Sequence, residues 1–299
     1  MGAPDDSSAP RLLAHAGGAR RVLQSAVREA RGMGEELGRL PAERRLARPD
    51  PPATGLVLDL GGGHDPFPRS DAVVDKYVDD DFEREGAIAR DRPLIVADGQ
   101  ALPFRDGSIA YVISSHVLEH ATDPEAFAAE VSRVADAGFV QLPTSVGERV
   151  MGWPFHPWFV ERDGDTLIFA PKASAEADWE GLHGLYDRSA LFRLMFFARR
   201  STFHHSVHWR GRLSVRVHGT SRAQRTAEFD LGRTIEALRT SPAPPLTPEL
   251  RAALCCPLCG TALRDVSGAL HCAGCARSYP VEGNVPLLLE EAAGAFVSA

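Results

Sequence analysis

The 299-residue chain has no cysteine outside positions 255–275, where all five of its cysteines lie. This absence excludes disulfides and a cysteine nucleophile from the rest of the chain. No run of about 18 apolar residues occurs, which is the length that a membrane-spanning helix needs. The N-terminus lacks a basic stretch followed by an apolar one, so we expect no secretory signal, no membrane partner and a cytoplasmic protein.

An excess of positive charge is also missing, because the formal net charge is −7. A broad nucleic-acid-binding face would need clustered positive charge, so the composition argues against one. The hydrophobic content of 44% is typical of a globular protein. The length suffices for one α/β domain and a small additional module.

Short apolar runs followed by small or acidic residues predict a parallel sheet. The first run, residues 56–60, leads into Gly61–Gly63, where the backbone can turn sharply and approach a ligand closely. The second run, residues 72–74, ends in Asp75, a carboxylate that can accept both hydroxyls of a ribose. The other predicted elements here are strands at 94–97, 109–114 and 138–143, and a helix that begins at Asp123 and Pro124.

This order of motifs resembles the class I S-adenosylmethionine-dependent methyltransferases, and most closely their type 11 subgroup. The resemblance covers roughly residues 54–145 and rests on Leu-Asp-Leu-Gly-Gly-Gly at 58–63, Leu-Pro-Phe at 102–104 and Leu-Glu-His at 118–120. It implies an α/β fold, a Rossmann-like methyltransferase sheet with helices on both faces. Asp65 and Ala110 depart from the pattern, which has a small residue and a carboxylate at these positions.

The resemblance also implies S-adenosylmethionine as cosubstrate and assigns residues to it. Asp75 would bind the ribose, Asp98 the adenine amine, and Asp59 would hold the loop at the methionine end. The predicted cofactor-binding residues are Asp59, Gly61, Gly63, Asp75, Asp98, Gly99, Gln100 and Ser115.

Histidines concentrate in the middle of the chain, between positions 116 and 218. Methyl transfer depends largely on positioning, but an oxygen or nitrogen acceptor can also need a base with a pKa near neutral. The predicted catalytic residues are His116, then His156 and His183. A packing or capping role for His116 and His120 stays open, as does a metal patch formed by His204, His205 and His208.

Two Cys-x-x-Cys knuckles, Cys256/Cys259 and Cys272/Cys275, predict a structural zinc ribbon. Four thiolate ligands leave no open position for catalysis. The alternatives are a domain that has lost its metal, or a redox pair, and Cys255 is a spare. With its flanking residues, this segment resembles the Trm112-like family, whose members bind and stabilise methyltransferase partners.

The chain is expected to divide into a helical arm (1–50), a methyltransferase domain (51–240), a linker (241–246) and the Trm112-like zinc ribbon (247–299). The arm would pack on the core or on a second subunit, which would form a homodimer; a tail or a lid over the cofactor stays open. Residues 145–186 fit no regular pattern and predict an aromatic loop or a lid over the acceptor. The remaining predicted elements are a helix at 187–199, a hairpin of strands 202–208 and 213–217, and a helix at 224–239.

These features together predict methyl transfer to oxygen or nitrogen of a small molecule, such as a specialised metabolite or a sugar. No Asn/Asp-Pro-Pro-Tyr follows the fourth predicted strand, which disfavours methylation of adenine or of a glutamine amide. The Trm112-like resemblance keeps methylation of tRNA or protein as an alternative, with arginines such as Arg199, Arg200 and Arg210 on phosphates. Asp65 and Ala110 keep a non-catalytic assembly protein as a third alternative.

Overall fold

The computed structural model describes residues 27, 31–32, 34–35, 37–81, 84, 86–172, 182–220 and 229–294. The chain forms two compact units, Met1–Leu46 with Gly184–Arg200, and Ala47–His183 with Ser201–Ala299. In the first unit, residues 37–46 are helical and α6 spans Ala190–Ala198. The side chain of Ser189 caps α6 by accepting a hydrogen bond from Phe192 N at 3.2 Å.

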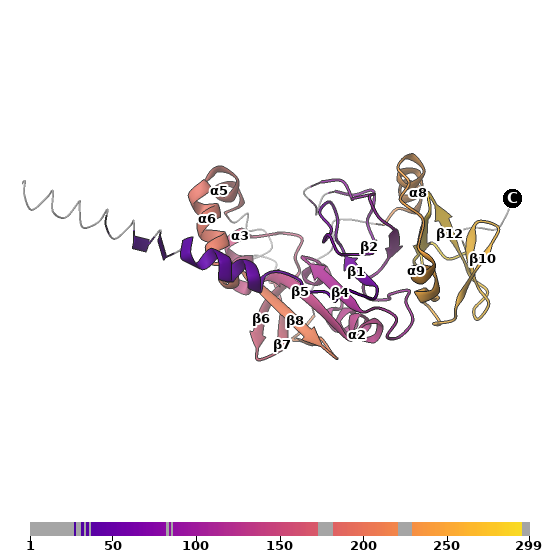
Figure 1. The fold of residues 1–299 in the computed structure, drawn as a ribbon, viewed down its shortest axis with the longest axis horizontal. Helices are drawn as coiled ribbons and strands as arrows, with labels where there is room; N and C mark the ends of the chain where they lie inside the picture. The colour runs from indigo at the N-terminus through magenta and orange to yellow at the C-terminus, as the bar shows by residue number, and fades with distance from the viewer. Residues whose placement is uncertain are drawn as a thin grey trace, which may run out of the picture. The chain divides into compact units, whose positions relative to one another are not determined.

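The second unit is built on one large sheet with the strand order β10-β11-β12-β13-β3-β2-β1-β4-β5-β8 (Figure 1). Its centre is parallel, and β8 closes one edge antiparallel to β5. The central strands are β1 (Val57–Leu60), β2 (Ala72–Asp75), β3 (Leu94–Ala97), β4 (Tyr111–Ser115) and β5 (Ala137–Pro143), with β8 at His204–Arg210. All five predicted parallel strands are confirmed, with boundaries that differ by at most a few residues.

Helices cover both faces of this sheet, as predicted. On one face, α2 (Pro124–Val134) packs Phe127 and Val131 against Leu58 of β1. On the other face, α8 (Leu231–Thr240) packs Leu238 against Val73 of β2. Successive strand residues point to opposite faces, so each strand contributes side chains to both layers and is buried on both.

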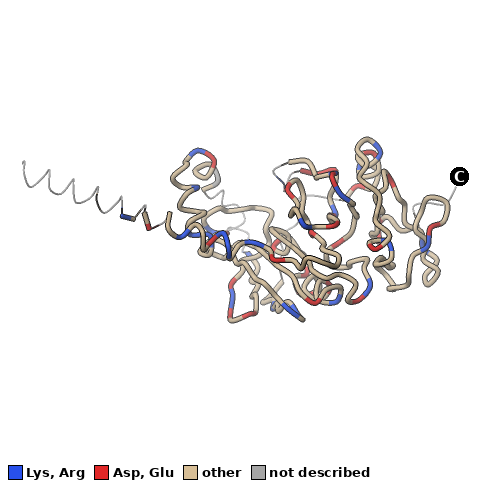
Figure 2. The backbone as a smooth tube through the Cα atoms, viewed as in Figure 1, with Lys and Arg blue, Asp and Glu red and all other residues tan. Residues whose placement is uncertain are grey.

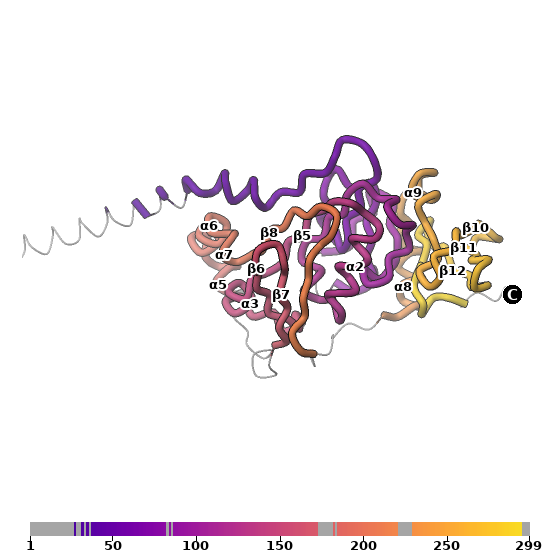
Figure 3. The backbone as a smooth tube through the Cα atoms, turned by 90° about the horizontal axis from the view of Figure 1, so that it is seen from below, coloured from indigo at the N-terminus to yellow at the C-terminus, as the bar shows by residue number. Residues whose placement is uncertain are grey.

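The C-terminal segment joins the large sheet rather than standing apart from it. Its last strand pairs parallel with β3, with Leu287 opposite Val96. Figure 3 shows α9 and β10–β12 gathered together at one end of the second unit. The elements of the segment are α9 (Pro248–Ala253), β10 (Leu263–Val266), β11 (Ala269–Cys272), β12 (Ser278–Glu282) and β13 (Val285–Leu288).

The prediction that residues 145–186 lack regular structure is wrong for most of the stretch. It contains α3 (Ser145–Met151), β6 (Trp158–Asp163) and β7 (Thr166–Pro171), whereas residues 173–181 lie outside the described part of the chain. The β6–β7 pair is an antiparallel hairpin, and Gly164 turns it with a φ of 58°. The two-residue loop is Gly164-Asp165, and a glycine at the first position of such a loop is a typical hairpin signal.

The predicted hairpin of residues 202–217 is also wrong, although both strands exist. Strand β8 pairs with β5 in the large sheet, whereas β9 (Ser214–Val217) pairs parallel with β7 in a separate sheet of order β6-β7-β9. Gly211, with a φ of 71°, turns the chain between the two strands. Strand β7 of the β6–β7 hairpin has a free edge, and β9 pairs with it. A prediction that treats residues 145–186 as a loop contains no such edge. The helix predicted at 224–239 is observed as α8, and residues 221–228 lie outside the described part.

Charges of both signs are interspersed along the described chain (Figure 2). Among the helices of the described residues, none has both the length and the apolar character that crossing a bilayer requires.

Candidate functional site

A cleft opens where the carboxyl ends of β1 to β4 meet. At this edge of a parallel sheet, the loops leaving neighbouring strands can converge on a ligand. Its lining includes six of the predicted site residues, Gly61, Asp75, Asp98, Gly99, Gln100 and His116. Asp59, Gly63 and Ser115 do not line the cleft but lie on the same strands or loops.

Two glycines keep the cleft open. Gly61 has a φ of 64°, and a Cβ atom there would lie 2.3 Å from Val117 Cγ2. A Cβ atom at Gly99 would lie 2.3 Å from Cε2 of Phe127. Both positions therefore require glycine, and the backbone itself forms the wall that a ligand would approach.

The two carboxylates of the cleft, Asp75 and Asp98, are held by their own partners. Asp75 accepts a hydrogen bond from Tyr77 N at 2.9 Å and lies 3.3 Å from the guanidinium of Arg84. Asp98 pairs with Lys76 Nζ at 2.9 Å and accepts a hydrogen bond from Gln100 N. Burial alone would raise the pKa of Asp98, but these two contacts outweigh it and hold the pKa below its usual value.

Asp59 acts on the loop after β1. Its Oδ2 accepts a hydrogen bond from Phe67 N at 2.6 Å, and only 3% of the residue is exposed. Burial raises the pKa of Asp59 to about 7, although the Phe67 N–H and the charge of Arg92 oppose that shift. The role expected for Asp59 at the methionine end of a cosubstrate stays a prediction.

His116 stands at the rim of the cleft in an unusual backbone conformation. Its φ is 58°, in the left-handed region that residues other than glycine rarely occupy. Its Nδ1 lies 3.2 Å from Oε1 of the buried Glu119, and 41% of its side chain is exposed. The His116 ring packs edge-on against His204 at 5.1 Å between centroids. Strained residues of this kind cluster at functional sites, because the surrounding structure must hold them in place.

His156 does not line the cleft and is almost fully buried. Its Nδ1 lies 2.7 Å from Glu148 Oε2, and Glu148 also pairs with Lys172. Burial and the nearby His120 push the pKa of His156 well below its usual value, so the ring is neutral at neutral pH. The ring of His156 meets that of His120 at 4.5 Å between centroids.

The structure brings His116, His120 and His156 together around Glu119. Of these three histidines, His116 and His156 were predicted as catalytic, together with His183, and His120 was not. His183 begins α5 (His183–Arg188), but its side chain lies outside the described residues. The residues that sequence reasoning missed are Glu119, His120, Glu148 and Lys172. The Leu-Glu-His motif marked the first two, whereas no local pattern marks the last two.

The alternative metal patch on β8 does not form among the described side chains. His204 is buried near His116, and His205 Nε2 lies 3.2 Å from the carbonyl oxygen of Val160. His208 is exposed and lies against the ring of Phe139. The three rings thus have three different surroundings.

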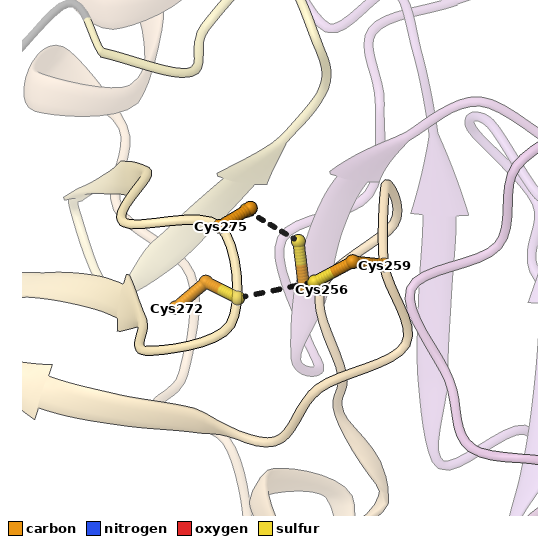
Figure 4. Close-up of side chains that lie close together, drawn as sticks. All are labelled: Cys256, Cys259, Cys272 and Cys275. Carbon is orange, nitrogen blue, oxygen red and sulfur yellow. Dashed lines mark hydrogen bonds between the residues drawn. The ribbon is translucent and has the colours of Figure 1, made fainter.

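The two cysteine knuckles meet as predicted (Figure 4). Cys256 Sγ lies 3.7 Å from Cys275 Sγ, and Cys259 Sγ lies 3.4 Å from Cys272 Sγ. All four sulfur atoms lie within 4.8 Å of one another. Zinc–sulfur bonds of about 2.3 Å in a tetrahedron require sulfur separations of about 3.8 Å, so these thiols fit one zinc ion.

Cys255 lies outside that group. It is buried, and burial raises the pKa of its thiol to about 11, so the thiol stays protonated. Its N–H donates to Pro103 O at 2.9 Å, which ties the start of the knuckle to the loop after β3. On the other side of the cluster, the Tyr279 hydroxyl lies 3.2 Å from Cys256 Sγ.

Two known families match separate parts of the chain. Residues 70–139 match the family described as "Methyltransferase domain", and residues 248–284 match "Trm112p-like protein". An uncharacterized methyltransferase found in three strains of Mycobacterium tuberculosis is 36% identical over 98 residues, which are 30% of this chain and 38% of the relative. The chain thus spans well under half the length of the curated relatives it matches.

Solved structures give a weaker likeness. A complex of the Haloferax volcanii Trm112 methyltransferase activator with a candidate methyltransferase is 18% identical, with a TM-score of 0.33, over 58% of this chain and 93% of that one. An S-adenosylmethionine-dependent methyltransferase from Mesorhizobium loti is 15% identical, with a TM-score of 0.28, over 67% and 78% of the two chains. The chain is thus similar to the methyltransferase-domain family over residues 70–139 and to the Trm112p-like family over residues 248–284.

Proposed function

We propose that this protein is an S-adenosylmethionine-dependent methyltransferase that methylates oxygen or nitrogen of a small molecule. The observation that supports this most directly is the cleft at the carboxyl ends of β1 to β4, which places Asp75, Asp98 and His116 around one opening. The methyltransferase-domain match over residues 70–139 supports the same reading.

Each part of the cleft has a role in this proposal. The bare backbone at Gly61 would accommodate the methionine end of the cosubstrate, because a side chain there would collide with Val117. Asp75 would accept the ribose hydroxyls, and Asp98 with Gln100 would bind the adenine. Bound S-adenosylmethionine supplies an activated methyl group, so the protein has mainly to position the acceptor and exclude water.

His116 would take the proton that an oxygen or nitrogen acceptor loses. Its ring lines the cleft, and Glu119 holds Nδ1 at 3.2 Å, which leaves Nε2 as the nitrogen for the acceptor. An imidazole held by a carboxylate is a common general base, because the carboxylate stabilises the protonated ring.

A macromolecular acceptor, tRNA or protein, is the second candidate, and the Trm112p-like match favours it. The net charge of −7 and the interspersed charges of Figure 2 favour the small molecule, because binding to RNA would need clustered cations.

We further propose that Cys256, Cys259, Cys272 and Cys275 hold a structural zinc ion. The sulfur separations of 3.4 and 3.7 Å support this assignment. Four thiolates fill the coordination sphere, so this zinc would stabilise the C-terminal segment and take no part in methyl transfer.

Calorimetric titration with S-adenosylmethionine and S-adenosylhomocysteine tests the proposal, followed by transfer of labelled methyl groups to small hydroxyl and amine acceptors and to tRNA. We expect both compounds to bind and labelled product to form from small acceptors. Product formed only from tRNA would favour the second candidate. Binding without any transfer would favour a non-catalytic role, and absence of binding would reject the proposal.

A further inference from the structure

A second group of side chains that can bind a metal ion lies apart from the cysteines. It consists of Glu119, His120 and His156. One ligand atom from each residue lies within 4.8 Å of the other two. Glu119 and His156 are 1% and 3% exposed, whereas His120 is half-buried and lines the cleft. Of the three residues, His120 is thus the one that connects the group to the cleft, and the other two are buried.

The carboxylate of Glu119 is only half satisfied. Its Oε1 lies 3.2 Å from His116 Nδ1, but its buried Oε2 has no hydrogen-bond partner among the described residues. A buried carboxylate oxygen without a partner is costly, and such atoms in folded proteins call for an explanation such as a bound ion. A cation beside Oε2 would satisfy it.

His156 is supported in the way that metal-binding histidines usually are. Its Nδ1 lies 2.7 Å from Glu148 Oε2, which leaves Nε2 as the nitrogen for a ligand. Glu148 in turn pairs with Lys172, whose Nζ donates to the carbonyl oxygen of Trp153 at 2.7 Å. A carboxylate that accepts the second N–H of a metal-bound imidazole fixes the orientation of the ring and strengthens it as a ligand.

Aromatic side chains surround the two imidazoles. Phe155 stacks on His120 with centroids 5.6 Å apart, and Trp153 lies 5.1 Å from the ring of His156. These contacts restrict both rings and reduce the access of water, so the ligands are preorganised without an ion.

We propose that Glu119, His120 and His156 bind a divalent first-row transition metal ion of the zinc or cobalt(II) type. Two neutral imidazoles and one carboxylate form a ligand set of catalytic zinc sites, and three protein ligands leave at least one position open. Because His120 lines the cleft, this open position would take an oxygen donor of the methyl acceptor, a hydroxyl or a carboxylate. Only this last step rests on the proposed function; the metal site itself does not.

Metal content and the cobalt(II) spectrum of the full-length protein test this site. After equilibration with zinc and removal of free ion, we expect one metal ion per chain beyond the one bound by the cysteines. With cobalt(II), the cysteine site should give intense sulfur-to-cobalt charge-transfer bands, whereas the nitrogen and oxygen site should add weak visible bands without them.

Glu119→Gln keeps the shape of the side chain and removes its charge, so it should lose the second metal ion and keep the cysteine-bound one. Glu148→Gln should weaken the binding of the second ion by about 10- to 100-fold, as expected for a residue that positions a metal ligand. His208→Ala, which removes an exposed histidine of β8, is the matched control and should bind both ions.

Equal metal content in the unsubstituted protein and in Glu119→Gln would overturn the proposal. If Glu119→Gln does not fold, the cobalt(II) spectrum of the unsubstituted protein tests the proposal instead. A spectrum with thiolate bands alone would also overturn the proposal. A second metal ion in a protein that does not bind S-adenosylmethionine would support this site and reject the proposed function. Binding of S-adenosylmethionine by a protein that holds only the cysteine-bound metal ion would reject this site and support the proposed function.

Discussion

Leu287 of β13 lies opposite Val96 of β3, and the two strands run parallel. Both side chains are fully buried, and they share a hydrophobic cluster with Leu238 of α8. The C-terminal segment thus covers the edge that β3 would otherwise expose. An uncovered edge strand is prone to pair with other chains, so this contact protects the large sheet as well as extending it.

Leu287→Ala should lower the free energy of unfolding by about 2–5 kcal/mol, because it opens a cavity in this cluster. The cluster contains residues of the central strands and of the C-terminal segment. We therefore expect both parts to unfold in one cooperative transition, at a lower denaturant midpoint. Val266→Ala in β10 is the control, because Val266 is 51% exposed, and it should change stability by less than about 0.5 kcal/mol. Two separate transitions in Leu287→Ala would contradict this coupling.

Cys259→Ser should remove the cysteine-bound zinc and lower the melting temperature, because much of the folding free energy of a zinc ribbon comes from the metal. Zinc analysis and thermal denaturation measure both effects. Cys255→Ser is the matched control, since Cys255 neighbours the cluster without belonging to it. Unchanged stability after loss of zinc would argue against a structural role for the ion.

Asp75→Ala should weaken the binding of S-adenosylhomocysteine by about 1–3 kcal/mol, the usual contribution of hydrogen bonds to a charged group. Calorimetry measures this directly. Asp81→Ala is the control, because Asp81 also pairs with Arg84 but does not line the cleft. Equal losses in the two variants would assign the effect to Arg84 and not to the ribose.

Stability should fall between about pH 4 and pH 7, in part because of Asp59. Its folded pKa of about 7 exceeds the unfolded value of 3.8, so the folded state binds the extra proton. The resulting stabilisation is complete below pH 3.8 and is lost as the pH rises through the folded pKa.

Asp59→Asn can still accept the hydrogen bond from Phe67 N, and it should flatten the slope by up to about 1.4 kcal/mol per pH unit. Denaturant titrations at several pH values measure that slope. Burial also raises the pKa of Glu148 to about 7, so part of the slope should remain in the variant. An unchanged slope would mean that Asp59 is ionised in the folded protein throughout this range.

Much of the fold could be predicted because its signals are local. A strand buried on both faces is largely apolar: residues 94–97 are apolar throughout, and residues 57–60 are apolar apart from the buried Asp59. Asp123 followed by Pro124 identified the start of α2, because helix capping depends on adjacent residues. The spacing of Cys256 and Cys259 likewise identified a knuckle, because two residues between cysteines allow both sulfurs to face one ion.

The errors concerned which segments pair. The strand at residues 213–217 was predicted, but not that β9 pairs with β7 instead of β8. Strand pairing depends on which edges are free after the other strands are in place, and β9 pairs with the edge that β7 of the β6–β7 hairpin supplies. The prediction of residues 145–186 as a loop did not include the Gly164-Asp165 turn, so this edge was absent from it.

The sequence by itself determined the central strands, the capped helix, the paired cysteines and the residues that would meet at the carboxyl ends of β1 to β4. Only the tertiary structure decided that β13 covers β3, and that Glu148 and Lys172 support His156 beside Glu119. The physical reason is that local patterns fix the conformation and the buried face of each segment. Contacts between distant segments depend instead on the packing of the whole chain, which no short stretch of residues encodes.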